Sequence, residues 1–224
     1  MNSKKQNLYI DRLIRTRRKS VSITITPKSE IIVRAPLGLS DEIIFDIVLK
    51  KHAWIKDKIG QISNIKEKAF APGESFPFLG SSYILQSTLN RNNIGVNGDR
   101  LEIPESFLHD AEKKLFEWYK NQALKILSER CAMVSEKTGI RPSSLKITGA
   151  KKRWGSCGHR GNINLSWRLA MCPVEVIDYV IVHELAHIKV RNHSKLFWDK
   201  VEELLPDYRE QELWLKKNSR SMNF

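Results

Sequence analysis

The sequence predicts an α+β protein: a small β-rich region with one helix over residues 1–104, then a more helical domain over residues 105–224. Three observations support this prediction. β-Branched runs bounded by turn residues are concentrated in the first region. Residues 162–169 alternate apolar and polar side chains, which is typical of a half-buried strand. Apolar residues recur at helical spacing in stretches on both sides of that strand.

Composition narrows the class of protein. With 224 residues and 41% apolar side chains, the chain can build a real core, as one large domain or one domain with a smaller companion. No apolar run approaches the roughly 20 residues of a membrane helix, and the N-terminus lacks the apolar segment of a secretory signal. Cys131, Cys157 and Cys172 form no C-x-x-C pair. We therefore expect a cytoplasmic protein with no membrane partner and no disulfide scaffold.

The positive charge of the chain is concentrated near its start. The net charge is +13, and residues 1–68 contain 15 Lys and Arg against 7 Asp and Glu. The densest run is RTRRK at 15–19. This basic N-terminal region permits a nucleic acid or another acidic partner. The plain alternative is a solvated basic surface, because net charge governs solubility and non-specific attraction, and no nucleic-acid motif accompanies it.

Turn residues divide the first region into predicted elements. The runs at 21–26 and 30–36 flank a Pro-Lys-Ser turn and predict a hairpin. Ser40 is a suitable N-cap for a helix over residues 41–59 that ends at Gly60. Residues 61–75 form a connector, and a second β-rich patch follows with a two-residue hairpin turn at Asn97-Gly98.

The second region begins with a long predicted helix from about residue 106 to residue 137, which Gly139 ends. The strand at 162–169 comes next, and a helix with Pro173 at its first position follows. Two further helices are predicted, at about 195–205 with Ser194 as N-cap, and from about residue 207.

The segment HELAHIKVRNH at 183–193 contains the strongest chemical signal. His183 and His187 lie four residues apart, so both imidazoles project from one helix face with Glu184 beside them. Asn192 tolerates the left-handed conformation that ends a helix, which lets His193 return toward the pair. Three protein ligands and one open position are the pattern of catalytic zinc, which lowers the pKa of water to about 7. The Glu of this motif is placed to accept that water's proton.

Two alternatives to this metal site remain open. The histidines could belong to a core helix and hydrogen-bond to backbone groups. The third ligand could instead be a carboxylate on a later helix, Glu210 or Glu212, although the short chain distance favours His193.

Five segments together resemble one family, namely RWGSC at 153–157, NINLSWRL at 162–169, DYVIVHELAH at 178–187, NHSKLFW at 192–198 and PDY at 206–208. The chain resembles the YgjP-like metallopeptidase domain family and, in its arrangement, the SprT-like and WLM peptidases. The resemblance implies a zincin-like catalytic domain with the H-E-x-x-H helix behind a β-hairpin or sheet. It also implies one Zn²⁺ ion bound by His183, His187 and His193, with Glu184 as catalytic base. Gly158 and Ser166 depart from the family pattern, which affects details of substrate contact.

The expected substrate contacts lie near the strand at 162–168. This strand or its hairpin partner is predicted to align an extended peptide by β-augmentation. The candidate substrate-binding residues are Arg153, Trp154, Asn164, Ser166 and Arg168. Tyr179, Arg153 and Arg168 are candidates for stabilising an oxyanion. Cys157 is expected to be a small apolar residue rather than a nucleophile, and His159 an exposed turn residue rather than a ligand.

These features predict a zinc-dependent hydrolase that cleaves peptide bonds in a peptide or protein substrate, by Glu-assisted attack of water at the metal. Two alternatives use the same residues differently. A basic surface beside a metal also suits hydrolysis of nucleotides or phosphate esters. A non-catalytic module that binds nucleic acid or protein would use zinc structurally, but such a site has four protein ligands and only three are evident.

Overall fold

The chain forms two compact units, which are described separately. The computed structural model describes residues 10–26, 28–63, 68–219 and 222. The first unit is Met1–Glu67 and the second is Lys68–Phe224. Helices and three small sheets are combined, so the predicted α+β class is confirmed. No helix within the described ranges is long and apolar enough to cross a membrane.

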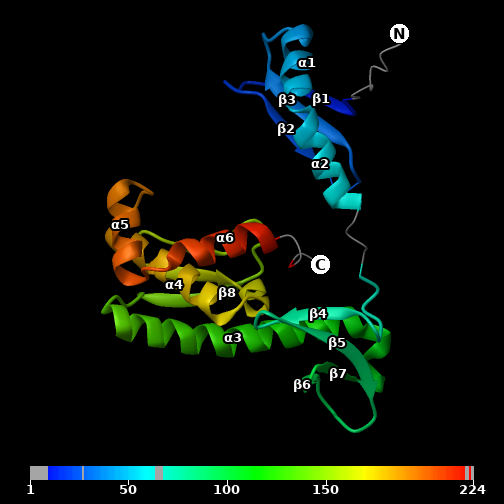
Figure 1. The fold of residues 1–224 in the computed structure, drawn as a ribbon, viewed down its shortest axis with the longest axis vertical. Helices are drawn as coiled ribbons and strands as arrows, with labels where there is room; N and C mark the ends of the chain where they lie inside the picture. The colour runs from blue at the N-terminus through cyan, green and yellow to red at the C-terminus, as the bar shows by residue number, and fades with distance from the viewer. Residues whose placement is uncertain (1–9, 27, 64–67, 220–221, 223–224) are drawn as a thin grey trace. The chain divides into compact units, whose positions relative to one another are not determined.

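The first unit is a three-stranded sheet packed against two helices (Figure 1). Its strands are β1 (Arg12–Thr16), β2 (Ser22–Ile25) and β3 (Ile31–Pro36), and β3 is central, parallel to β1 and antiparallel to β2. The β2–β3 pair is the predicted hairpin. Strand β1 is not predicted from the sequence, because its mixed charged and apolar residues lack a clear alternation.

The helix predicted over 41–59 is two helices, α1 (Asp41–Lys50) and α2 (His52–Ser63). The N-cap prediction holds, because the side chain of Ser40 accepts a hydrogen bond from the Ile43 N–H at 3.4 Å. The chain leaves helical geometry at Lys51, and this break lets both helices contribute to one core. That core consists of Ile31, Val33, Ala35, Ile44, Val48 and Ile55.

The second unit is built on a long helix, α3 (Ala111–Thr138). Gly139 ends it with φ at +67°, a left-handed conformation that glycine adopts without steric cost. A short 3₁₀ helix, η1 (Glu105–Asp110), precedes it, so the α-helix starts later than predicted. Helical spacing in the sequence predicts that Leu124 lies on the buried face of this helix, but its side chain is 58% exposed.

A four-stranded sheet packs against the start of α3. Its strands are β4 (Ser75–Phe78), β5 (Ser81–Thr88), β7 (Arg100–Pro104) and β6 (Gly95–Asn97), in that order. β6 and β7 form the hairpin predicted at Asn97-Gly98. The Tyr119 hydroxyl of α3 donates a 2.6 Å hydrogen bond to the Pro77 carbonyl of β4.

The units divide earlier in the chain than the predicted boundary at residues 104/105. The four-stranded sheet and α3 share one apolar core, because Phe76, Leu85 and Leu101 pack in the same cluster as Leu115. Hydrophobic burial therefore joins residues 68–104 to the metal-site region. The sequence grouped these strands with the first hairpin only because both stretches are β-rich.

A second sheet of this unit leads to the motif helix. It contains β8 (Ser144–Thr148), β9 (Gly155–Cys157) and β10 (Asn162–Ser166), with β10 in the centre, parallel to β8 and antiparallel to β9. The strand predicted over 162–169 ends at Ser166. Residues Trp167–Met171 form a 3₁₀ helix, η2, because the Ser166 hydroxyl accepts the Arg168 N–H and starts a turn.

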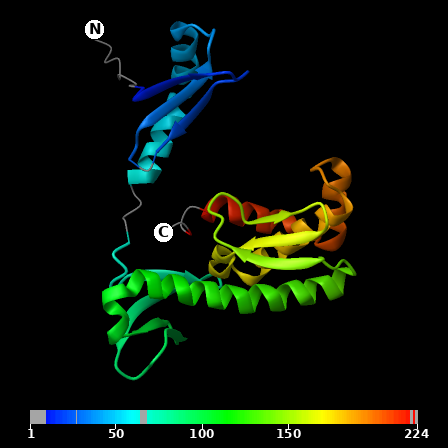
Figure 2. The ribbon, with the colours of Figure 1, turned by 180° about the vertical axis from the view of Figure 1, so that it is seen from behind.

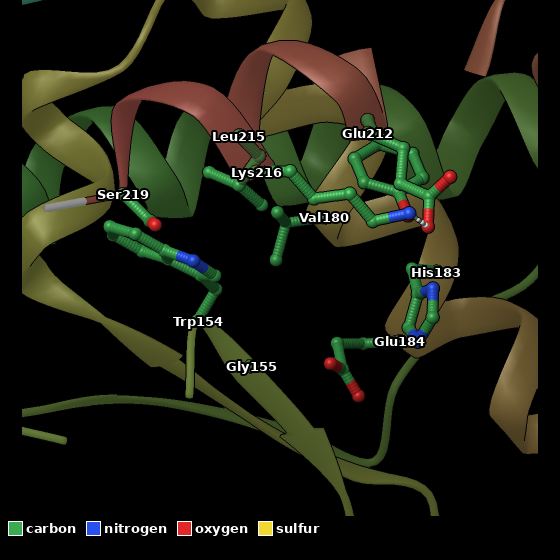
Figure 3. Close-up of a pocket in the computed structure, with 10 residues that line it drawn as sticks. Trp154, Gly155, Val180, His183, Glu184, Glu212, Leu215, Lys216 and Ser219 are labelled. Atoms are coloured by element: carbon green, nitrogen blue, oxygen red, sulfur yellow. Dashed lines mark ion pairs between the residues drawn. The ribbon is translucent and has the colours of Figure 1, made fainter. Parts of the chain in front are cut away.

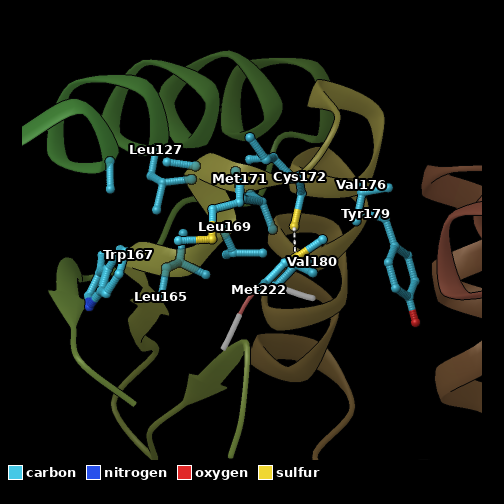
Figure 4. Close-up of a cluster of buried hydrophobic side chains, with 14 of the residues drawn as sticks. Leu127, Leu165, Trp167, Leu169, Met171, Cys172, Val176, Tyr179, Val180 and Met222 are labelled. Atoms are coloured by element: carbon cyan, nitrogen blue, oxygen red, sulfur yellow. Dashed lines mark hydrogen bonds between the residues drawn. The ribbon is translucent and has the colours of Figure 1, made fainter. Parts of the chain in front are cut away.

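Helix α4 (Val174–Lys189) contains the motif, and α5 (Lys195–Leu204) and α6 (Tyr208–Asn218) follow it. Figure 2 shows the β8–β10 sheet and α4 lying along α3. Figure 4 shows the apolar cluster between them, including Leu127, Leu165 and Val180. Arg130 of α3 also forms a two-pronged ion pair with Asp178 of α4, with a 2.8 Å contact from Nε to Oδ1. The apolar cluster and this ion pair thus attach the motif helix α4 to α3.

Candidate metal centre and adjoining cavities

Three histidine side chains converge at the end of α4. The Nε2 atom of His193 lies 3.1 Å from Nε2 of His183 and 3.1 Å from Nε2 of His187. Within the described ranges, these three residues are the one group of His, Cys, Asp or Glu side chains close enough to share a metal ion. The structure therefore brings together the three predicted ligands.

The local hydrogen bonding suits a metal. The Val190 carbonyl lies 3.1 Å from Nδ1 of His187, so the proton of that neutral ring belongs on Nδ1 and the lone pair on Nε2. Two nitrogens bound to one tetrahedral zinc ion at 2.0–2.1 Å would lie about 3.3 Å apart. The observed separations are close to this value, so the residues present fit a divalent metal.

The end of α4 explains how His193 reaches the pair. The helix stops at Lys189, and Val190 is extended, which turns the chain back. Asn192 then accepts a hydrogen bond from the Ser194 N–H at 3.3 Å, just before α5 begins. The helix therefore ends at Lys189, and no left-handed residue follows it in the part of the chain that the structure describes. Asn192 is predicted to adopt a left-handed conformation, but it acts instead through the hydrogen bond of its side chain.

Phe197 of α5 packs against all three imidazoles. Its ring centroid lies 4.9 Å from that of His183, 4.4 Å from that of His187 and 4.8 Å from that of His193. The Phe197 side chain is fully buried. The sequence predicts only a helix at this position, and the structure adds that Phe197 restricts the orientation of the three imidazole rings.

The electrostatic environment favours the neutral form of His183 and His187. Burial, together with the nearby His187 and His193, lowers the pKa of His183 to about 4. Burial also lowers the pKa of His187, and the hydrogen bond to the Val190 carbonyl opposes that shift. Neutral imidazole is the form that binds metal ions, because the proton of the charged form occupies the lone pair.

Glu184 is buried beside the histidines. Its side chain is 6% exposed, and burial raises its pKa to about 7, with the charge of Arg153 acting in the opposite direction. Gly155 of β9 lies directly against it, since a Cβ atom at Gly155 would be 2.4 Å from Oε1 of Glu184. The glycine leaves room for the carboxylate. A carboxyl group with a pKa near neutrality can both accept and donate a proton at physiological pH.

A cavity of about 370 Å³ opens beside His183 and Glu184. Figure 3 shows Trp154 and Gly155 on one side and Leu215, Lys216 and Glu212 of α6 on the other. Val180 forms part of the apolar wall. The sequence did not identify α6 as a wall of this cavity, because nothing in its local pattern shows which helix packs across α4.

The two carboxylates considered as alternative ligands lie apart from the histidine cluster. Glu210 is exposed on α6. Glu212 lines the cavity, but its Oε1 atom pairs with Nζ of Lys216 at 2.6 Å. The geometry therefore favours His193 as the third member of the group.

The predicted substrate residues have different surroundings. Trp154 lines the cavity next to Glu184, and the exposed Arg153 lines a second cavity beyond it. Asn164 is half-buried, and its amide donates to the Ser156 hydroxyl at 3.2 Å. The buried Ser166 donates its hydroxyl to the Ala150 carbonyl at 3.0 Å. Ser166 thus fixes the 149–153 loop, and Arg168 is buried behind it.

The strand prediction needs one correction. β10 has β8 on one side and β9 on the other, so its backbone has no open edge for an extended peptide. Its hairpin partner β9, the second option at the sequence level, has β10 on one side and an edge without a strand partner among the described residues. β9 also contains Gly155, which faces Glu184.

Tyr179, a candidate for oxyanion stabilisation, lines the cavity beside His183 and Glu184. Its ring is buried and stacked on Tyr208, and burial raises the pKa of its hydroxyl. His159 is exposed, as expected. Arg191 donates to the carbonyl of Gly158 at 2.8 Å and to that of His159 at 2.6 Å, which ties this turn to the end of α4. Burial raises the pKa of the Cys157 thiol, so it is a poor nucleophile.

An α+β domain with converging histidines, a buried glutamate and an adjoining cavity defines a candidate metal-dependent hydrolase. The model of the YgjP-like metallopeptidase domain family matches residues 19–218, so the chain belongs to that family. A divalent metal is accordingly expected in these proteins. The family assignment agrees with the resemblance found in the sequence.

Two solved structures are similar over part of the chain. The metallopeptidase zymogen abylysin of Pyrococcus abyssi is 23% identical, with a TM-score of 0.37, and the match covers 41% of this chain and 93% of that chain. The metallopeptidase zymogen jannalysin of Methanocaldococcus jannaschii is 20% identical, with a TM-score of 0.35, covering 41% and 95%. A search of curated protein sequences found no match.

Proposed function

We propose that this chain is a zinc-dependent peptidase that uses His183, His187 and His193 as ligands and Glu184 as general base. The observation that supports this most strongly is the convergence of three Nε2 atoms beside a buried carboxylate. Three histidines leave one coordination position of a tetrahedral ion for water or substrate, as catalytic zinc requires. Membership of a metallopeptidase family supports peptide bonds as the substrate.

The residues of the chain have distinct tasks in this reaction. When bound, the metal ion would lower the pKa of water and polarise the scissile carbonyl. Glu184 accepts the proton of the attacking water and then donates it to the leaving amine. Its pKa near 7 suits both steps. Phe197 and the hydrogen bond from His187 to the Val190 carbonyl hold the rings in the binding orientation.

The open edge of β9 is suited to bind the substrate backbone. An extended peptide that pairs with Gly155–Cys157 would pass directly over Glu184, because Gly155 is in contact with that side chain. Main-chain hydrogen bonds of this kind bind peptides largely without regard to sequence, whereas a neighbouring cavity selects side chains. The cavity lined by Trp154 and Val180 suits an apolar side chain.

A second candidate function is hydrolysis of nucleotides or other phosphate esters. It is favoured by the cluster of Lys151, Lys152 and Arg153 next to Trp154. Positive side chains beside a metal offset the charge that develops on phosphate oxygens.

Comparison of the wild-type protein with Glu184→Gln tests the proposed function. Both proteins, loaded with Zn²⁺, are assayed against an unstructured protein and against a set of nucleotides. We expect the wild type to cleave the protein, and Glu184→Gln to lose at least about 100-fold in rate because it lacks the general base. Zinc content should be equal in both. A fully active Glu184→Gln protein would contradict the mechanism, and cleavage of nucleotides alone would favour the second function.

A further inference from the structure

A second cavity, of about 230 Å³, adjoins the one that contains Glu184. The two cavities share Trp154 in their walls. Lys151, Lys152, Arg153 and Arg168 line the second cavity, and no acidic residue does so among the residues described. The wall is therefore strongly positive, although it lies next to the proposed catalytic site.

Arg168 is the unusual member of this set. Its side chain is only 4% exposed. Its guanidinium donates a hydrogen bond to the Gly149 carbonyl at 3.4 Å, and its buried Nε atom has no hydrogen-bond partner among the described residues. The guanidinium also lies 4.5 Å from the centroid of the Trp167 ring. No carboxylate of the described chain pairs with this buried charge.

Arg130, a partly buried arginine in the same unit, is paired with a carboxylate. It is less buried than Arg168, and yet both prongs of its guanidinium contact the carboxylate of Asp178. Removing a charge from water costs several kcal/mol unless a partner of opposite charge is present. Among the described residues, Arg168 has only the face of Trp167 and one weak backbone bond, so none of them compensates for the burial of its charge.

The surroundings of Arg168 hold it in place for a ligand. Ser166 fixes the Ala150 carbonyl, and Arg168 itself contacts Gly149, so the loop over residues 149–153 is tied down at its start. The same loop supplies Lys151, Lys152 and Arg153 to the cavity. A planar guanidinium flanked by lysines is an arrangement that binds carboxylates and phosphates.

The position of the cavity connects it to the reaction. Trp154 separates the two cavities, and Arg153 is close enough to Glu184 to influence the charge of its carboxylate. A peptide with its scissile bond at Glu184 and a residue in the first cavity would extend past Trp154 toward Arg168. The next acidic group of that peptide would then meet the positive wall.

We propose that this second cavity binds a carboxylate of the substrate, either the C-terminal carboxylate of a peptide or an acidic side chain, with Arg168 as its anchor. This inference rests on the proposed peptidase function, because it defines which peptides that site selects. Arg168 acts as a specificity residue. It contacts the substrate at a distance from the scissile bond, and so it is not assigned to oxyanion stabilisation.

The test measures binding and cleavage separately. The zinc-loaded Glu184→Gln protein, which holds peptides without cleaving them, is titrated calorimetrically with sets of matched peptides. One set differs only in a free or amidated C-terminus, and another only in Asp or Asn, or Glu or Gln, at successive positions. We expect a carboxylate at one place to tighten binding at least about tenfold, which is about 1.4 kcal/mol. The set that shows the effect identifies the source of the carboxylate.

Variants assign the effect to the cavity. In the Glu184→Gln background, Arg168→Met should abolish the preference for the carboxylate. Because Arg168 is buried, Lys151→Ala with Lys152→Ala provides a second variant that cannot disturb a core, and it should reduce the preference two- to fivefold. The exposed Lys146→Ala on β8 is the matched control and should retain the full preference.

Several results would overturn the inference. One is that the Glu184→Gln protein, with the cavity otherwise unchanged, binds all peptides of the matched sets with equal affinity. Another is a carboxylate preference that survives both the Arg168 and the lysine variants. Tenfold tighter binding of a phosphorylated peptide than of its Glu counterpart would instead assign the cavity to phosphate.

Failure of this inference can be told apart from failure of the proposed function. If wild-type protein cleaves amidated and carboxylate peptides with equal kcat/KM, the peptidase stands and the anchor role of Arg168 does not. If no peptide is cleaved, the calorimetric comparison still reports on Arg168.

Discussion

The two units differ in what their interiors contain. Every buried residue described in the first unit is apolar, from Ile31 on β3 to Ile55 on α2. The second unit also buries Ser135, Ser166, Arg168 and Glu184. Buried polar groups reduce stability unless they are paired, so a protein retains them mainly where they serve binding, catalysis or structure. The three histidines and the cavity beside Glu184 also belong to the second unit. We therefore propose that the first unit is a scaffold and that the second carries out the chemistry.

A methyl group at Gly155 should affect chemistry through Glu184. A Cβ atom there would lie 2.4 Å from Oε1 and 2.7 Å from Cγ of Glu184, so the carboxylate must move. We expect Gly155→Ala to lower kcat by about 100-fold, because misplacing a catalytic group by about 1 Å has an effect of this size. Zinc content should not change.

Gly38 of the first unit provides the matched control. A Cβ atom there would meet nothing within 4 Å. Gly38→Ala should therefore keep kcat within twofold. Equal losses in the two alanine variants would remove the assigned role of the close approach between Gly155 and Glu184.

A cavity in the core of the first unit should reduce stability without changing the chemistry. Ile44 is fully buried between α1 and the sheet. We expect Ile44→Ala to lower the free energy of unfolding of this unit by about 2–4 kcal/mol. Hydrogen exchange of the backbone amides of this unit, measured at increasing denaturant concentration, would report this change.

In the folded fraction of Ile44→Ala, kcat/KM for a short peptide should equal that of the wild type. A large loss of peptide turnover at full occupancy of the folded state would show that the first unit takes part in catalysis. The contrast between scaffold and catalytic unit would then have to be abandoned.

The smallest effect is expected at the basic surface of the first unit, formed by Arg12, Arg17, Lys19 and neighbouring exposed cations. Arg17→Glu with Lys19→Glu should change stability by less than about 0.5 kcal/mol, because both side chains are exposed. Peptide turnover should also be unchanged. If the basic surface attracts nucleic acid, as the sequence permits, the same variant should lose binding in low-salt mobility-shift measurements. If the wild-type protein does not change the mobility of nucleic acid, the basic surface is only a solvated surface.

Local sequence patterns are sufficient to predict which three histidines the structure brings together. The spacing of His183 and His187 follows from helix geometry alone, and the short connection made His193 the preferred third ligand. Gly139 and Ser40 were found in the same way, because a cap depends on residues within one turn.

Features that depend on distant packing were not predicted. The approach of Gly155 to Glu184, the packing of Phe197 on the imidazoles and the wall formed by α6 all join elements far apart in the chain. Arg168 was placed on the polar face of a strand because the alternation extends to it. The Ser166 cap ends that strand and places the side chain of Arg168 in the interior.

Metal stoichiometry tests whether three imidazoles hold one metal ion. Wild-type, His193→Ala and Glu210→Ala proteins are dialysed with limiting Zn²⁺, and bound metal is measured by inductively coupled plasma mass spectrometry. We expect about one tightly held ion per chain in the wild type and in Glu210→Ala, and at least about tenfold weaker binding in His193→Ala. Equal retention by His193→Ala, with loss in Glu210→Ala, would contradict this expectation.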